Sequence, residues 1–219
     1  MIFRKIDYLN LLPFHMFLKR RLKSSSERSA WQRHGSVPSS VNRAFFGRRV
    51  DAAVISSVKS RGLKCTDMGI VADGEVRSVL LLPGSFEKDS ESDTSNALAK
   101  ALGLEGKVII GDKALHYYLG DNPEGIDLAA EWKRRYKLPF VFARLCAHPR
   151  YFKRIEKLSK EFLSKPQKVP IYILKKKAME HGISCKDLKE YLALIYYRIG
   201  WRERRSLGRF LWLTKRSGL

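Results

Sequence analysis

The stretch VDAAVISS, residues 50–57, is the segment that most directly predicts the fold. From Ala52 to Ile55 an extended chain would place apolar side chains on both faces, which is typical of a strand covered on both sides. The polar pair Ser56 and Ser57 ends the run. We therefore predict a buried strand with serines at its carboxyl end, the edge at which open α/β sheets bind ligands.

Similar apolar runs recur on both sides of this stretch and alternate with segments of helical spacing. The predicted strands are IFRKI (2–6), RSVLLLPG (77–84), KVIIGD (107–112) and LPFVFARL (138–145). The predicted helices between them are LLPFHMFLKRRL (11–22), VPSSVNRAFF (37–46), SDTSNALAKALG (92–103) and GIDLAAEWKRRYK (125–137). This alternation predicts an α/β protein with mainly parallel pairing. After residue 148 only helices are expected, over 149–164, 168–181, 184–198 and 201–214.

Charge is the unusual feature of the composition. The 219 residues include 43 Lys and Arg against 22 Asp and Glu, a formal net charge of +21, so a polyanionic partner has to be considered. The chain begins MIFRKIDYLN, which lacks the features of a signal peptide, and no apolar run approaches the roughly 20 residues needed to span a bilayer. We expect a cytoplasmic protein with no membrane partner. The sequence does not predict the oligomeric state.

Metal and disulfide chemistry find little support in the sequence. Cys65, Cys146 and Cys185 are few, odd in number and far apart, so we expect neither a disulfide framework nor a metal knuckle, and we expect all three to be reduced. No histidine pair has the spacing of a zinc protease. A G-x-S-x-G elbow, a P-loop and a G-x-G-x-x-G loop are also absent, which weakens hydrolase, NTPase and dinucleotide-binding hypotheses.

Four polar residues before the helical run of residues 92–103 suggest an anion site. They are Ser92, Asp93, Thr94 and Ser95. Hydroxyls and free N–H groups at a helix start suit a carboxylate or a phosphate. The alternative is simple N-capping, which needs only one of these residues.

Other candidate ligand contacts lie at the ends of predicted strands. Ser56 and Ser57 follow one strand, while Arg77 and Ser78 open another. Arginine can grip a carboxylate with two hydrogen bonds and serine adds a neutral donor, although Arg77 could equally be a surface charge. Asp112 follows a glycine turn and is more typical of a helix N-cap than of a catalytic acid.

Taken together and in order, several motifs resemble those of the chorismate dehydratases of the futalosine route to menaquinone. They include IDYLNLLPF (6–14), SVPSSVNRAFFGRRVDAAVISSVKS (36–60), DGEVRSVLLLPG (73–84), DTSNALAKAL (93–102), IIGDKAL (109–115), LPFVFA (138–143) and YLALIYYRIGWRERRSLGRFL (191–211). The resemblance implies a type 2 periplasmic-binding-protein-like fold, with two α/β lobes joined by two crossing strands and a C-terminal helical segment. The larger lobe would comprise residues 1–83 and 140–219, the smaller lobe residues 84–139, and the ligand would bind in the cleft between them.

The same resemblance implies a carbon–oxygen lyase that converts chorismate to 3-[(1-carboxyvinyl)oxy]benzoate and water without a metal or cofactor. The residues expected to bind the substrate are Ser56, Ser57, Arg77, Ser78, Thr94, Ser95 and Asp112. Asn10 would be catalytic: an amide cannot act as a base, but it can hydrogen-bond the departing hydroxyl or orient the substrate. The proton acceptor would then be the substrate's own side-chain carboxylate or a bound water.

The sequence departs from the family pattern after LPFVFA. A tryptophan is usual near the position of Leu145, where this chain reads RLCAH. Arg144, Cys146 and His148 therefore receive no assigned role.

Three other functions remain open. One is the related dihydroxynaphthoate synthase, although no histidine occurs here in an equivalent motif, and another is a cytosolic binding protein or sensor for an anionic metabolite. The third is nucleic-acid binding through YYRIGWRERRSLGRFLWLTKR (196–216), where aromatics alternate with arginines. We favour instead an amphipathic helix that packs through Leu207, Phe210, Leu211 and Leu213, with the positive charge steering a dianionic substrate.

Overall fold

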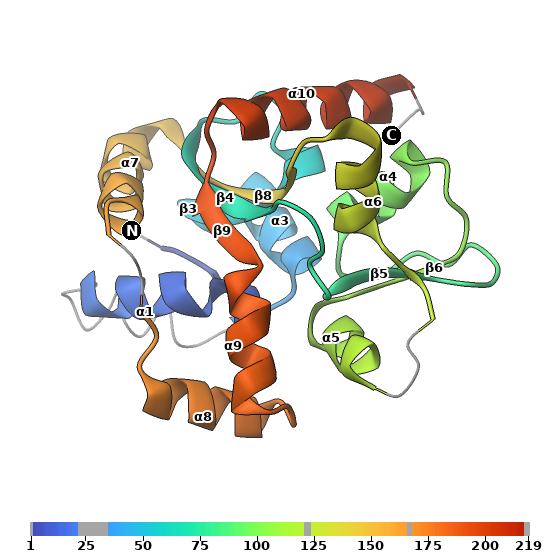
Figure 1. Ribbon diagram of the computed structural model, residues 1–219. Helices are drawn as coiled ribbons and strands as arrows, with labels where there is room; N and C mark the ends of the chain where they lie inside the picture. Colours follow the sequence, from blue (N-terminus) through green and yellow to red (C-terminus); the bar gives the residue numbers. More distant parts are fainter. Residues whose placement is uncertain (1, 22–34, 121–123, 166–167, 217–219) are drawn as a thin grey trace.

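Two β-sheets organise the computed structural model, which describes residues 2–21, 35–120, 124–165 and 168–216 (Figure 1). The first sheet has the order β3-β8-β4-β9, formed by Ala52–Ser56, Phe140–Ala147, Cys65–Ala72 and Ile195–Arg198. The second has the order β6-β5-β7, formed by Lys107–Ile110, Val79–Leu82 and Ile126–Asp127. A short parallel pair, β1 (Lys5–Ile6) and β2 (Gly35–Ser36), is joined to the first sheet by a bridge between Phe3 and Ala52.

The predicted α/β class is confirmed, but the prediction of mainly parallel pairing is wrong. Both larger sheets are antiparallel throughout the described strands, and β1–β2 is the single parallel ladder there. The reason is that β8 returns from the smaller lobe and enters between β3 and β4, running opposite to both. The continuous apolar character of β3 reflects burial of all five residues and does not depend on strand direction.

Two segments connect the sheets and create two lobes. Residues 73–78 lead from β4 to β5, and residues 137–139 lead from α6 (Leu128–Tyr136) back to β8. This is the two-lobed arrangement with two crossings that the family resemblance implies. Strand β5 lies in the three-stranded sheet, so the first crossing comes before residue 79. The division into residues 1–83 with 140–219 and residues 84–139 stays a prediction.

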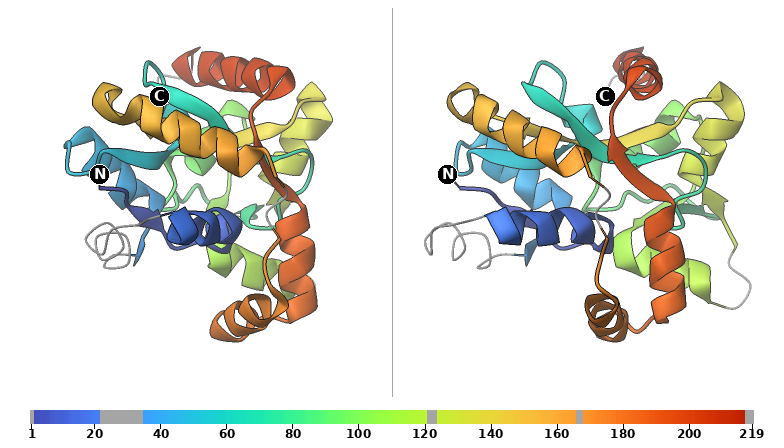
Figure 2. Two further views of the ribbon diagram at one scale, coloured as in Figure 1. Left: turned by 90° about the vertical axis from the view of Figure 1, so that its left-hand side faces the viewer. Right: turned by 60° about the vertical axis from the view of Figure 1, so that its left-hand side comes forward.

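Helices cover both lobes (Figures 1 and 2). The larger lobe has α1 (Leu12–Arg21), α3 (Pro38–Phe46), α7 (Pro149–Leu163), α8 (Ile171–Glu180), α9 (Cys185–Ala193) and α10 (Trp201–Arg216), and the smaller lobe has α4 (Asp93–Ala101), α5 (Gly111–Leu119) and α6. Short 3-10 turns η1 (Leu9–Leu11) and η2 (Ser57–Lys59) follow β1 and β3. The all-helical prediction after residue 148 is wrong at β9, which pairs with the edge of β4.

The helix α10 packs against both lobes. On the smaller lobe, the indole N–H of Trp132 donates to the hydroxyl of Ser206 over 2.9 Å. On the larger lobe, the Phe210 ring lies 5.0 Å from that of Phe140. Figure 1 shows α10 along the outer edge of the molecule, above β8 and α6. The helix therefore links the two lobes in this closed arrangement.

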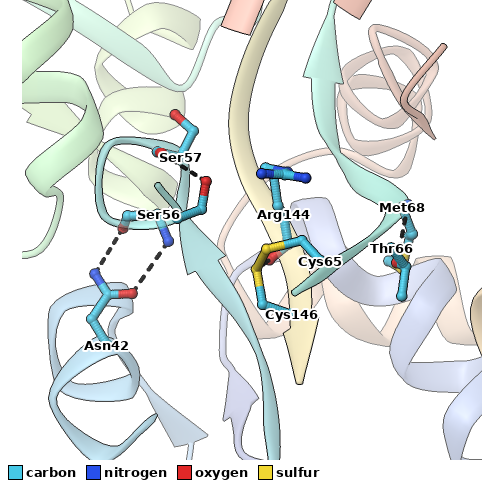
Figure 3. Close-up of a disulfide and its surroundings, with 9 residues drawn as sticks. Asn42, Ser56, Ser57, Cys65, Thr66, Met68, Arg144 and Cys146 are labelled. Carbon is cyan, nitrogen blue, oxygen red and sulfur yellow. Dashed lines mark hydrogen bonds between the residues drawn. A yellow bond between two sulfur atoms is a disulfide. The ribbon is translucent and has the colours of Figure 1, made fainter. Parts of the chain in front are cut away.

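The prediction that all three cysteines are reduced is wrong for two of them. Cys65 at the start of β4 lies directly opposite Cys146 in β8, with 3.9 Å between the Cα atoms, and the two form a disulfide (Figure 3). They are 81 residues apart in sequence. They meet because β8 inserts beside β4, a pairing that cysteine spacing cannot reveal. Cys185 is a free thiol.

Candidate functional site between the lobes

A small cavity lies where the two lobes meet. Its volume is about 60 Å³, and its walls include the apolar residues Val54, Ile70, Val79 and Phe142. Six polar residues also line it: Tyr8, Asn10, Ser56, Ser78, Ser92 and Ser95. Ligand pockets usually measure roughly 300–1,000 Å³, so the lobes must separate before a ring-sized ligand can enter. A larger groove of about 800 Å³ beside α7 and β9 is more open and does not join the two lobes.

Asn10 contributes a buried amide to this cavity. It lies in η1, directly before α1, and its backbone carbonyl accepts a hydrogen bond from the Tyr197 hydroxyl over 2.6 Å. Its side chain hydrogen-bonds the hydroxyl of Tyr191. The Oδ1 atom is buried and has no hydrogen-bond partner among the described residues. A buried carbonyl oxygen without a partner costs about 1–3 kcal/mol, so a ligand hydroxyl would be a favourable partner here.

Tyr8 joins the larger lobe to the smaller one. Its hydroxyl donates to the carboxylate of Glu91, and burial together with that carboxylate raises the pKa of the phenol. The ring lies against Gly111 at the start of α5, where an added Cβ would come within 2.9 Å of it. Gly111 also has a φ of +66°, a conformation that favours glycine. The glycine in the IIGD motif thus makes room for the tyrosine ring.

A second connection between the lobes runs through Asn42 of α3. Its amide nitrogen donates to the hydroxyl of Ser56 over 2.9 Å and to the carboxylate of Asp93 over 3.1 Å. The Ser56 N–H donates back to the Asn42 carbonyl oxygen over 3.2 Å. Figure 3 shows the two hydrogen bonds that fix Ser56. Asn42, which sequence reasoning missed, therefore holds the first predicted serine at the cavity.

The start of α4 is both capped and exposed to the cavity. Ser92 is the N-cap, because its hydroxyl oxygen accepts the N–H of Ser95 over 3.1 Å. The Ser92 hydroxyl also donates to that of Ser95 over 2.9 Å, and both serines line the cavity. Thr94 instead meets Ser57 across the lobes, with 3.5 Å between their hydroxyl oxygens. Ser57 and Thr94 are buried beside the cavity and are not part of its wall.

Ser78 lies on the crossing segment before β5. Its hydroxyl accepts from Tyr191 over 3.0 Å, and its carbonyl accepts the N–H of Gly111 over 2.9 Å. Tyr191 belongs to α9 and is almost completely buried, which raises the pKa of its phenol. Tyr191 lies within the YLALIYY stretch, and nothing local in that stretch indicates that its hydroxyl reaches Ser78 and Asn10.

Two predicted substrate ligands lie outside the cavity wall. Arg77 pairs with Glu75 over 2.7 Å, and its guanidinium lies 5.3 Å from the centre of the Tyr118 ring. Asp112 lies 2.9 Å from Nδ1 of His181, and burial raises the pKa of its carboxyl. For either residue to contact the substrate, the Arg77–Glu75 and Asp112–His181 pairs would have to rearrange. Contact of Arg77 and Asp112 with the substrate therefore stays a prediction.

The residues left without a role after LPFVFA also lie away from the cavity wall. The Nε atom of Arg144 is buried without a hydrogen-bond partner in the described part of the chain, and burial lowers the pKa of the guanidinium. The His148 ring stacks on Phe45 with 4.3 Å between ring centres. Within residues 2–21, 35–120, 124–165 and 168–216, no cluster of three or more His, Cys, Asp or Glu could hold a metal.

Comparison with known proteins supplies independent findings. The model of a protein family described as menaquinone biosynthesis matches residues 90–216. A chorismate dehydratase from Campylobacter jejuni is 43% identical over 224 residues, covering 100% of both chains. A crystal structure of an Archaeoglobus fulgidus protein aligns with a TM-score of 0.65 over 99% of this chain and 97% of that one. At 12% identity, this last likeness shows a shared fold alone.

Proposed function

We propose that this chain, which belongs to the menaquinone-biosynthesis family, is a chorismate dehydratase that converts chorismate to 3-[(1-carboxyvinyl)oxy]benzoate and water. The observation that carries the proposal is the 43% identity to a chorismate dehydratase along the full length of both chains. The cavity between the lobes supports it, because polar groups from both lobes converge there around apolar walls.

The reaction needs little beyond a correctly held substrate. The C–H bond that breaks is on the ether-bearing ring carbon, in vinylogous conjugation with the ring carboxylate. The neighbouring C–O bond breaks as the hydroxyl leaves, the departing hydroxide and the proton lost from carbon together make up the released water, and the ring becomes aromatic. Because aromatisation drives the reaction, the protein contributes mainly by holding a reactive geometry. We propose that no metal or cofactor takes part and that the reaction occurs in the cytoplasm.

Neutral donors would bind the two carboxylates of chorismate. Ser56, Ser78 and Ser95 present hydroxyls to the cavity. The helix α5 begins at the same cavity without a side-chain cap, and a helix N-terminus favours a carboxylate. Negative charge grows toward the ring carboxylate as the proton leaves, so donors fixed around that group would stabilise the transition state.

Asn10 would orient the leaving hydroxyl. Its buried Oδ1 can accept the hydroxyl hydrogen of the substrate, while the Asn10 nitrogen remains directed at Tyr191. No His, Asp, Glu, Lys or Arg side chain is among the described residues that line the cavity. This supports the hypothesis that the proton acceptor is the substrate's own side-chain carboxylate or a bound water.

Closure of the lobes would exclude bulk water during the reaction. Among the contacts between the lobes, three pairs lie at or beside the cavity: Tyr8 with Glu91, Asn42 with Asp93, and Ser57 with Thr94. We propose that these contacts break when chorismate enters and re-form around it.

The decisive experiment is to incubate the purified protein with chorismate and to follow the aromatic ether by ultraviolet absorbance and mass spectrometry. Chorismate without protein is the control, and a parallel reaction with a metal chelator tests independence from metals. Formation of the benzoate ether at an undiminished rate in chelator is the expected result. Binding of chorismate by calorimetry without any turnover would contradict the proposal and favour a sensor.

A further inference from the structure

The outward side of α10 carries two tryptophans in a basic setting. Trp201 is 67% exposed and Trp212 is 54% exposed. Eleven residues correspond to about three helical turns, so the two rings lie on the same side of the helix. Arg205 lies over the Trp201 ring at 5.8 Å and Arg216 over the Trp212 ring at 4.7 Å. We define these four residues together with Lys215 as the outer stripe.

The outer stripe is not needed to pack α10 on the protein. The opposite side of the helix does that through Leu207 and Phe210, which are buried, and through Leu211 and Leu213, which are partly buried against the core. The prediction that these four residues form the packed face is therefore confirmed. Large exposed tryptophans remain unexplained by packing, and together with clustered charge they indicate an interaction surface.

Among the described residues, the positive charge of the outer stripe has no carboxylate partner. Glu203 is the single acidic residue of α10, and it is buried, accepting hydrogen bonds from Tyr196 and from the N–H of Gly200. Arg202 and Arg204 pair with aspartates of the larger lobe. Arg205, Lys215 and Arg216 form no ion pair with any other residue that the structure describes. A polyanion could therefore approach this side of α10 without displacing an existing salt bridge.

We propose that the outer stripe docks α10, lying flat, on the surface of an anionic phospholipid bilayer. Tryptophan rings favour the headgroup region of a bilayer, and basic side chains are attracted to anionic headgroups. Nucleic acid fits less well, because base stacking needs open aromatic faces and an arginine covers one face of each ring. No described helix could span a membrane, so the attachment is to the surface. This departs from the sequence expectation of no membrane partner.

The helix α8 offers a matched control. It also exposes large apolar side chains, Tyr172 at 69% and Met179 at 79%, next to lysines. There, however, Lys176 and Lys177 pair with Glu180, so part of the positive charge is neutralised. Comparing the two helices separates specific binding by the outer stripe from non-specific adsorption of a basic protein to an anionic surface.

The test is co-sedimentation with vesicles of phosphatidylcholine alone and of phosphatidylcholine mixed with phosphatidylglycerol. The full chain should bind the mixed vesicles at low ionic strength and lose binding as salt rises. The double variant Trp201→Ala/Trp212→Ala should bind about tenfold or more weakly. The double variant Tyr172→Ala/Met179→Ala should bind like the unaltered protein, and both variants should keep the chorismate turnover measured without vesicles.

Three results would overturn the proposal. The first is absence of binding to the mixed vesicles at low salt, and the second is an equal loss of binding in the α8 variant. The third is tryptophan-dependent binding to a single-stranded oligonucleotide with no vesicle binding, which would assign the outer stripe to nucleic acid.

Discussion

The hydroxyl of Tyr191 donates to the hydroxyl oxygen of Ser78 over 3.0 Å, although the two residues are 113 positions apart in sequence. The same tyrosine is hydrogen-bonded by the side chain of Asn10. Tyr191 thus positions two polar groups of the cavity without being part of its wall. It ties α9 to the crossing segment and to the turn before α1.

We expect Tyr191→Phe to lower kcat about tenfold, since the loss of one or two hydrogen bonds corresponds to roughly 1–1.5 kcal/mol. KM should change less, because the ring and the packing around it remain. Tyr196→Phe is the matched control, as its hydroxyl donates to Glu203 away from the cavity. Steady-state kinetics of both variants check the prediction, and equal kcat values for the two would contradict it.

Asn10→Ala should lower turnover about a hundredfold or more, because removal of one hydrogen-bonding side chain at the reacting atoms of an enzyme typically has an effect of this size. The fold should survive, because Oδ1 has no hydrogen-bond partner among the described residues. Single-turnover formation of the benzoate ether and far-ultraviolet circular dichroism measure the two effects. Asn96→Ala is a suitable control, because that amide bonds the backbone of Asp89 outside the cavity. A wild-type rate in Asn10→Ala would show that the assigned role is wrong.

Gly111→Ala should be more harmful than Gly62→Ala. Both glycines have positive φ, +66° and +73°, so each substitution brings backbone strain of about 1–2 kcal/mol. Only at Gly111 would the new Cβ meet a neighbour, the Tyr8 ring at 2.9 Å, whereas Gly62 has nothing within 4 Å. Urea unfolding should show the larger loss of unfolding free energy for Gly111→Ala. The chorismate assay should show a lower kcat for this variant than for Gly62→Ala. Equal losses of stability with unchanged kcat would contradict this account.

Reduction of the Cys65–Cys146 disulfide should lower the free energy of unfolding by about 2–4 kcal/mol, because the bond closes a long loop in the unfolded chain. Urea unfolding with and without dithiothreitol measures the change, and Cys185→Ser should leave it unaltered. Thiol titration of the denatured, unreduced protein should find one thiol per chain. Three thiols in protein isolated from cells without a reductant would show that the cellular form is reduced.

His15 should make the protein less stable in mild acid. Its imidazole is buried in α1, and burial lowers its pKa from 6.5 to about 3. As the pH falls from 6.5 toward 3, the unfolded chain takes up a proton that the folded chain does not, so stability falls. The stability advantage of the wild type over His15→Gln should therefore shrink across this range. Chemical unfolding of both proteins at several pH values checks this, and a constant difference would count against it.

Local patterns were sufficient for much of the fold. The apolar runs around β3, β5, β6 and β8 are strands, because their burial is encoded residue by residue. Ser92 caps α4, since a cap depends on neighbours three residues away. Asn10, Ser56, Ser78 and Ser95 line one cavity, in agreement with their positions at strand and helix ends.

The sequence by itself thus determined the α/β elements and the polar residues at their ends. Only the tertiary structure decided which strands pair and in which direction, that Cys65 meets Cys146, and that Tyr191 reaches Ser78 and Asn10. It also placed the Arg77 guanidinium over the Tyr118 ring and away from the cavity wall. The physical reason is that helix and strand periodicity reports which side of an element is buried. The partner across that buried side comes from a distant part of the chain, and its identity is settled when the two lobes pack together.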